Sequence, residues 1–218
     1  MKVYFLLLCG LVLLVWACSP TFAYGPISHG NIVDRMMEDP DISYAVSLRG
    51  LSGSTISSEA ALGDLYMPSN IHSNQWNNIR LVANLNASWM TWPLNNTYAG
   101  WLMHNIGDTS VPAVHSPANT WYTTGWAEAL FEAQSEFYGM PGWPNPHYYT
   151  SNRDYNGYTV YFYNEMNSLA NSFKSHNESY WPCKYFHVCQ TDWIDDDCKR
   201  AALKLSWNVF YYYLINHP

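Results

Sequence analysis

The sequence predicts an all-α protein, and three observations support this prediction. Apolar residues recur at helical spacing in several segments, and clusters of Gly, Pro and Asn separate those segments. Only residues 158–163, which are rich in aromatic and β-branched side chains, have the composition of a strand, so a strand there is the alternative. We therefore expect a single-domain helical bundle.

The expected helices follow from local patterns in the chain. In residues 31–38, two pairs of apolar side chains are four positions apart and therefore share one side of a helix. Residues 57–65 open with Ser-Ser-Glu, which is typical of a helix cap, and residues 126–138 are rich in the helix formers Ala, Glu and Leu. The remaining predicted helices cover residues 79–89, 98–106, 158–173 and 199–215.

The first 23 residues have the features of a signal peptide. Lys2 supplies a positive start, residues 5–15 are almost wholly apolar, and Ala23 completes a small-residue pattern at which signal peptidase cleaves. The apolar run is shorter than the roughly 20 residues that a spanning helix needs. We expect a secreted or periplasmic protein whose mature domain covers residues 24–218. The alternative is a lipoprotein anchored at Cys18.

Charge and composition limit the kinds of partner. The chain carries a formal net charge of −7, with only 12% charged but 17% aromatic residues. An acidic surface disfavours electrostatic capture of nucleic acid, so we expect no stable nucleic-acid complex. Amphipathic aromatic rings suit contacts with sugars, lipid headgroups or a membrane interface. We therefore expect transient contact with a membrane surface.

Three cysteines follow the signal peptide, namely Cys183, Cys189 and Cys198. An exported protein enters an oxidising compartment, so two of the three are expected to form a disulfide bond and the third to be free or intermolecular. The alternative is a metal site that combines thiols with His187, although no CxxC spacing is present.

The stretch WLMHNIGDTSVPAVH, residues 101–115, is the most informative about function. His104 and Asp108 are four residues apart, so a helix would project both from one face. His115 follows Pro112, which would end or redirect that helix. Imidazole and carboxylate groups that converge in this way suit zinc. The structural alternative is a helical histidine with an aspartate that caps a nearby turn.

Three further features nearer the amino terminus supply candidate ligands. The mature chain would begin at Tyr24, whose freed α-amino group can bind a metal once deprotonated, and His29 follows closely. Asp64 and His72 are eight residues apart. Their structural alternatives are a helix-terminal turn residue and a surface loop histidine. Together with residues 101–115, they bring the candidate ligands to four histidines and two aspartates.

This ordering resembles the zinc-dependent phospholipases C, a family related to the single-strand-specific zinc nucleases. The resemblance rests on Tyr-Gly-Pro-Ile-Ser-His at the expected mature start, on Gly-Asp followed by a histidine, and on the motif HNIGDTSVPAVH. It covers residues 24 to 132, and no recognised motif covers the carboxy-terminal third. In that family an all-helical domain holds zinc ions in a cleft, which implies two to three zinc ions here.

The resemblance implies a set of ligands for each ion. The first zinc would take Asp64, His72, His104 and Asp108. The second would take the amino nitrogen and carbonyl oxygen of Tyr24, together with His29 and a bridging Asp108. The third would take His115, Glu128 and Glu132.

Three departures from the family are visible. The mature chain begins with Tyr instead of Trp, which leaves the backbone ligands intact, and one extra residue separates Asp108 from His115. Glu128 stands where a histidine is expected, which makes the third site more anionic and able to favour another cation. The alternative for Glu128 and Glu132 is a solvated helix face, with His147 as a substitute ligand.

Such a cluster of metal ions suits the hydrolysis of phosphate esters. Metal ions bind the non-bridging oxygens and lower the pKa of bound water to about 7. The resemblance implies that Asp64 orients this water as a base. We therefore expect phospholipase C-type cleavage of phospholipid headgroups by zinc-bound hydroxide, with Tyr66 and Trp76 as rings that could face a cationic headgroup. The alternatives are a single-strand nuclease or nucleotidase of the same fold, and a non-catalytic, metal-stabilised secreted binding protein.

Overall fold

The computed structural model describes residues 25–68, 71, 88–111, 134–136, 139–142, 164–169, 171–173, 175–176, 179 and 192–217. Within these residues every regular element is a helix, which confirms the predicted all-α fold class. In chain order the elements are α2 (Pro26–Met37), α3 (Pro40–Leu48), α4 (Gly53–Ala61), α5 (Gly63–Tyr66), the 3-10 helix η1 (Ser88–Thr91), α7 (Asn96–Thr109) and α12 (Asp192–Asn216). The signal peptide at 1–23 and the alternative strand at 158–163 lie outside the described residues.

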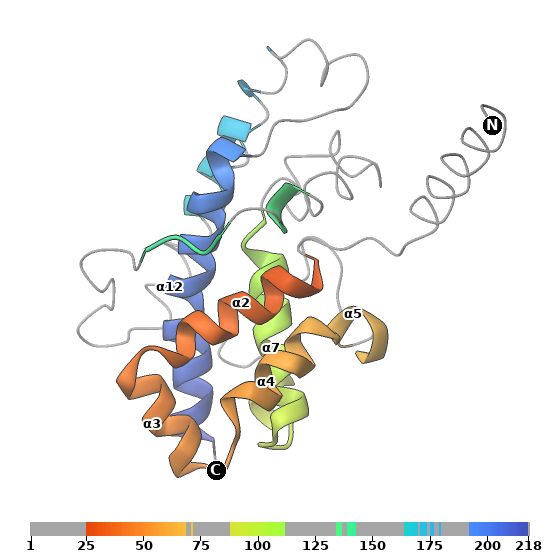
Figure 1. The fold of residues 1–218 in the computed structure, drawn as a ribbon, viewed down its shortest axis with the longest axis vertical. Helices are drawn as coiled ribbons and strands as arrows, with labels where there is room; N and C mark the ends of the chain where they lie inside the picture. Colours follow the sequence, from red (N-terminus) through yellow and green to blue (C-terminus); the bar gives the residue numbers. More distant parts are fainter. Residues whose placement is uncertain are drawn as a thin grey trace, which may run out of the picture.

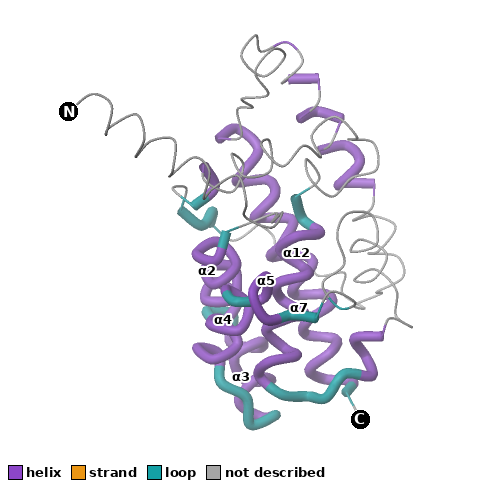
Figure 2. The backbone as a smooth tube through the Cα atoms, turned by 90° about the vertical axis from the view of Figure 1, so that its right-hand side faces the viewer, coloured by secondary structure: helices purple, strands orange, loops and turns teal. Residues whose placement is uncertain are grey.

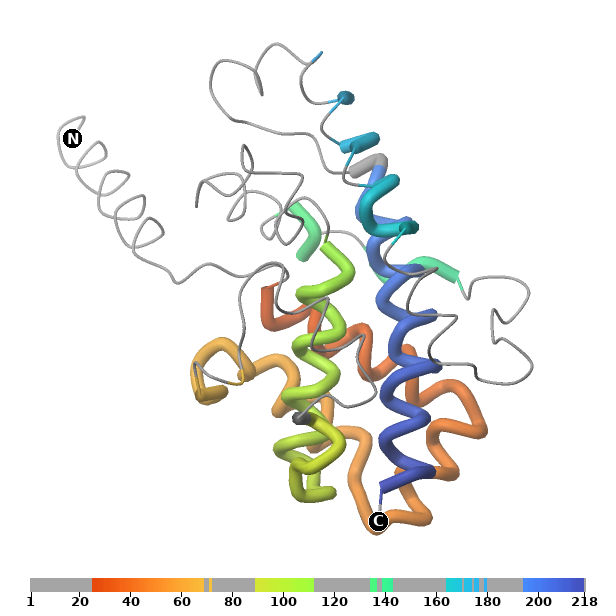
Figure 3. Tube along the Cα trace, turned by 180° about the vertical axis from the view of Figure 1, so that it is seen from behind, coloured from red at the N-terminus to blue at the C-terminus, as the bar shows by residue number. Residues whose placement is uncertain are grey.

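Two long helices form the centre of the bundle. α7 and α12 lie side by side and run in opposite directions, as Figures 1 and 3 show. α2 contacts both of them, α4 packs against α2 and α7, and α3 lies against α12. In Figure 2, which is turned by 90°, α5 lies beside α4 and α7. The elements that carry His29, Asp64 and His104 therefore come together around α7.

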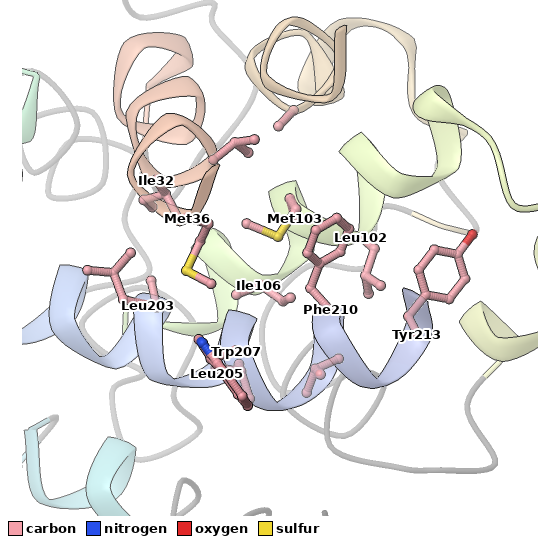
Figure 4. Packing of buried hydrophobic residues seen from close by; sticks show 14 of the residues in the cluster. Ile32, Met36, Leu102, Met103, Ile106, Leu203, Leu205, Trp207, Phe210 and Tyr213 are labelled. Atoms are coloured by element: carbon pink, nitrogen blue, oxygen red, sulfur yellow. The ribbon is translucent and has the colours of Figure 1, made fainter. Parts of the chain in front are cut away.

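The hydrophobic core fills the space between α2, α7 and α12, as Figure 4 shows. Met36 from α2, Met103 and Ile106 from α7, and Phe210 from α12 are all at most 1% exposed. Burying an apolar side chain of this size contributes about 1.5–3 kcal/mol. The core therefore fixes α2 and α7 relative to each other, and these helices carry the two histidines of the candidate site.

Side-chain caps explain where several helices begin, and they correct the predicted boundaries. Ser52 is the N-cap of α4, and its hydroxyl accepts a hydrogen bond from the Thr55 N–H (3.4 Å). The helix therefore begins at Gly53 and not at the predicted residue 57. α3, which was not predicted, starts behind Asp39, whose carboxylate accepts from the backbone N–H groups of Asp41 (2.9 Å) and Ile42 (3.2 Å). The same carboxylate accepts from the Trp207 indole (2.9 Å) and thereby ties α3 to α12.

Arg49 caps the carboxyl end of α12, the last helix of the bundle. The guanidinium donates to the carbonyl oxygens of Leu214 (2.7 Å), Ile215 (3.3 Å) and His217 (3.0 Å). A positive charge there also complements the helix dipole. Neither α12 nor any other described helix combines the length and the apolar character needed to cross a membrane.

Candidate metal centre

The predicted pair His104 and Asp108 lies on one face of α7, one turn apart. Asn95 caps this helix by accepting a hydrogen bond from the Tyr98 N–H (3.0 Å), and the helix ends at Thr109. The helix therefore extends past the predicted end at residue 106 and stops before the proline at position 112 in the sequence. His104 Nε2 lies 3.4 Å from Asp108 Oδ2, and both side chains are at most 1% exposed. The spacing of the two residues therefore places an imidazole and a carboxylate in contact inside the protein.

His29 reaches the same carboxylate from α2. Its Nε2 lies 3.2 Å from Asp108 Oδ1, and its side chain is fully buried. The imidazole rings of His29 and His104 stack with their centroids 3.9 Å apart and an angle of 25° between their planes. The two oxygens of Asp108 therefore face two different histidines, one from α2 and one from its own helix.

Asp64 completes the group from α5, the short helix that follows α4. Asp64 Oδ1 lies 3.1 Å from His104 Nε2, so this nitrogen faces a carboxylate oxygen of both Asp64 and Asp108. The Asp64 side chain is 4% exposed and is the most exposed of the four. The structure thus brings the predicted residues His29, Asp64, His104 and Asp108 together.

A backbone carbonyl determines which nitrogen of His104 faces the carboxylates. His104 Nδ1 lies 2.9 Å from the Ala60 carbonyl oxygen, which can only accept a hydrogen bond, so Nδ1 carries a proton and donates it. Nε2 of a neutral His104 then presents a lone pair to Asp64 and Asp108. The lone pair of this nitrogen and those of the carboxylate oxygens would repel each other unless a cation lies between them. That cation is either a second proton on the imidazole or a metal ion.

The two histidines respond oppositely to this environment. Burial alone would lower the pKa of His104, but the neighbouring Asp108 and Asp64 carboxylates raise it well above its ordinary value of 6.5. Burial and then the charge of His104 lower the pKa of His29, against the opposing effect of Asp108. Without a metal, these opposite shifts of the two pKa values favour the additional proton on His104 over His29.

Two glycines leave room for the imidazoles. A Cβ atom added at Gly63 would lie 2.5 Å from the Cγ and Nδ1 atoms of His104. A Cβ at Gly107 would lie 2.6 Å from Nδ1 of His29. Real Cβ contacts essentially never fall below 3.0 Å, so any larger residue would displace a ring. Both histidines are therefore held in positions that only glycine permits.

The donor set and its spacing are compatible with a metal ion. Zinc binds imidazole nitrogen and carboxylate oxygen at about 2.0–2.1 Å, and two such ligands on a tetrahedral ion lie about 3.3 Å apart. The three nitrogen-to-oxygen distances here are 3.1, 3.2 and 3.4 Å. Ligand atoms of His29, His104 and Asp108 also all lie within 4.8 Å of one another. These residues could therefore hold a metal ion.

Comparisons with family models, with curated proteins and with solved structures find no match to this chain.

The other predicted ligands and cysteines lie largely outside the described residues. These are Tyr24, His72, His115, Glu128, Glu132 and the substitute ligand His147, and also Cys183 and Cys189. The one cysteine that the structure describes, Cys198, is a free, buried thiol. Burial, followed by the neighbouring Asp195 and Asp197, raises the pKa of its thiol well above its ordinary value, which disfavours the reactive thiolate form.

The sequence analysis did not identify one acidic residue that contacts α2, the helix that carries His29. Glu136 accepts a hydrogen bond from the Ser28 N–H (3.0 Å), directly before His29 in the chain. The available signal was the four-residue spacing of Glu132 and Glu136, which repeats that of Glu128 and Glu132. The sequence could not predict the hydrogen bond from His104 to the Ala60 carbonyl or the close approach of His29 to Gly107, because both depend on how the helices pack.

Proposed function

We propose that this protein is a metal-dependent phosphodiester hydrolase of the phospholipase C type, with two to three zinc ions. The position of Asp108 supports this proposal most strongly. Its oxygens face His29 at 3.2 Å and His104 at 3.4 Å, so one carboxylate can bridge two ions. Zinc ions supply charge stabilisation for the phosphate and activate water for attack.

In this proposal, some residues hold the metal and another orients the attacking water. His29, His104 and Asp108 are the buried ligands, and the Ala60 carbonyl fixes the ring of His104 in the orientation that binding requires. We assign Asp64 the role of orienting base. Its side chain is 4% exposed, and the two residues that follow it on α5, Leu65 and Tyr66, are exposed to solvent.

The surface beside Asp64 favours a lipid substrate over a nucleic acid. Leu65 and Tyr66 follow Asp64 directly and are 66% and 67% exposed. Exposed apolar and aromatic side chains suit a lipid surface, and an aromatic ring can also face a quaternary ammonium headgroup. The net charge of −7 would repel a polyanion. A zwitterionic phospholipid such as phosphatidylcholine is therefore the proposed substrate class.

Paired assays test this function. The purified, zinc-loaded protein is incubated separately with phosphatidylcholine vesicles and with single-stranded DNA. Release of diglyceride, lost in Asp108→Asn and retained in the exposed control Asp41→Asn, is the expected result. Release of mononucleotides from the DNA alone would identify a nuclease instead. Full zinc occupancy with neither activity would identify a metal-stabilised binding protein.

A further inference from the structure

We propose that Glu136 is a positioning residue for the metal centre. It caps the first turn of α2 from a distant part of the chain and thereby sets where His29 presents its imidazole. This role presupposes the metal centre of the proposed function.

The start of α2 lacks a cap of its own. Gly25 occupies the N-cap position and has no side chain to accept a hydrogen bond, and Pro26 at the first helical position has no N–H group. The first turn of a helix leaves backbone N–H groups without partners inside the helix. At Ser28, which is 1% exposed, water cannot easily satisfy the N–H group. A partner from elsewhere in the protein is therefore needed.

Glu136 supplies that partner. Its Oε1 accepts from the Ser28 N–H at 3.0 Å, and Ser28 is the third residue of the helix, whose N–H group a cap side chain ordinarily binds. A carboxylate at this end also complements the positive end of the helix dipole. A Cβ added at Gly25 would lie 2.5 Å from the same Oε1 atom. Glycine at this position therefore makes room for the distant carboxylate.

The capped turn leads directly to a metal ligand. His29 follows Ser28, and its N–H donates to the Gly25 carbonyl oxygen at 3.2 Å in the first helical hydrogen bond of the turn. The imidazole of His29 is confined by Gly107, where an added Cβ would lie 2.6 Å from Nδ1. The ring fits this narrow space only when the first turn holds the His29 backbone in place. Loosening the turn would therefore move the His29 ring relative to Asp108.

Glu136 is itself held by a buried anchor on α12. The neighbouring Ser135 donates its hydroxyl proton to Asp195 Oδ1 at 2.5 Å, and Lys199 Nζ donates to the Ser135 carbonyl oxygen at 3.0 Å. Lys199 and Asp195 also form an ion pair of 2.8 Å. All three residues are at most 1% exposed. This anchor fixes the backbone beside Glu136 and so connects α12 to the start of α2.

Cobalt binding tests the role of Glu136. The purified protein is titrated with Co²⁺, and the d–d absorption and the dissociation constant are measured for the wild type, Glu136→Ala and Glu136→Gln. Loss of a residue that orients a ligand weakens metal binding about 10- to 100-fold, which is the effect we expect of Glu136→Ala, together with an altered spectrum. Glu136→Gln keeps an oxygen acceptor for the Ser28 N–H and is expected to resemble the wild type.

Two further variants separate capping from general damage. Glu165→Ala removes a different glutamate, which is partly buried and pairs with Lys204 on α12 at 2.9 Å, and it should leave the cobalt spectrum unchanged. Adding Gly25→Ser to Glu136→Ala provides a local cap and should restore cobalt affinity. Hydrogen exchange of the Ser28 and His29 amides, which does not depend on metal, should be faster in Glu136→Ala alone.

The outcomes distinguish this role from the proposed function. Wild-type cobalt binding with an unchanged Glu136→Ala variant would overturn the role of Glu136 and leave the metal centre standing. An equal loss in Glu165→Ala would also overturn it. If the wild type binds no Co²⁺, the metal centre and this role both fail, and the exchange measurement then reports whether Glu136 still caps α2.

Discussion

His29 and His104 stack face to face inside the protein, with their ring centroids 3.9 Å apart. Two imidazolium ions so close together would repel each other strongly in a buried environment, so only one ring can carry the additional proton. The flanking carboxylates assign that proton to His104. Metal ions in place of this proton would be held by both rings and Asp108, because the two Nε2 atoms face different oxygens of that residue.

This replacement predicts how stability depends on pH. The raised pKa of His104 means that its stabilising contribution to the metal-free protein is fully present below its unfolded value of 6.5 and is lost as pH rises through the raised value. Zinc competes with this proton, so the increase in melting temperature on adding zinc should be larger at about pH 9 than at about pH 6. Thermal unfolding with zinc and with chelator at both pH values checks this. An increase that is the same at both pH values, or larger at the acidic one, would contradict it.

Gly107→Ala is expected to weaken zinc binding while leaving the helix intact. The added Cβ would lie 2.6 Å from the His29 ring and must displace it. Alanine in place of glycine inside a helix contributes about 1 kcal/mol of helix propensity, so a purely local effect would stabilise α7. Zinc affinity is measured by competition with a chelator. Gly139→Ala, where nothing lies within 4 Å of the added atom, is the control and should bind zinc normally.

The buried anchor on α12 predicts a large loss of stability in Lys199→Met. This change leaves the Asp195 carboxylate buried without its ion-pair partner, which costs about 3–5 kcal/mol. The free energy of unfolding from urea titrations provides the measurement. Lys204→Met removes a more exposed partner from the Glu165 pair and should cost less than about 1 kcal/mol. Equal costs for the two variants would contradict this account of the anchor.

The sequence predicted the helical fold class and singled out four residues that the structure brings together, because these predictions depend on local spacing and on residue chemistry. The spacing of His104 and Asp108 places both on one helix face whatever surrounds it. The start of α2 and the existence of α3 were missed, since Pro26 and Pro40 stand at first helical positions, where proline is tolerated, and not at helix ends. Glu136 was missed because its partner Ser28 is 108 residues away.

The exposed side chains beside Asp64 predict selective loss of activity on aggregated lipid. If the proposed function holds, Leu65→Ser and Tyr66→Ser together should lower the hydrolysis of phosphatidylcholine vesicles severalfold, because the protein loses apolar contact with the lipid surface. Hydrolysis of a short-chain, monomeric phosphatidylcholine should change little. Tyr44→Ser with Leu48→Ser is the matched control, since these residues are 68% and 69% exposed but lie on α3. Equal losses in both double variants would contradict a contact surface at α5.

The position of bound zinc tests the central claim most directly. Crystals grown with zinc are measured with X-rays on both sides of the zinc absorption edge, and the anomalous difference density is examined. We predict a peak in contact with the Nε2 atoms of His29 and His104 or with the carboxylate between them, and loss of that peak in Asp108→Asn. Full-strength zinc peaks elsewhere in the protein, with none beside Asp108, would contradict the metal centre and the function proposed from it.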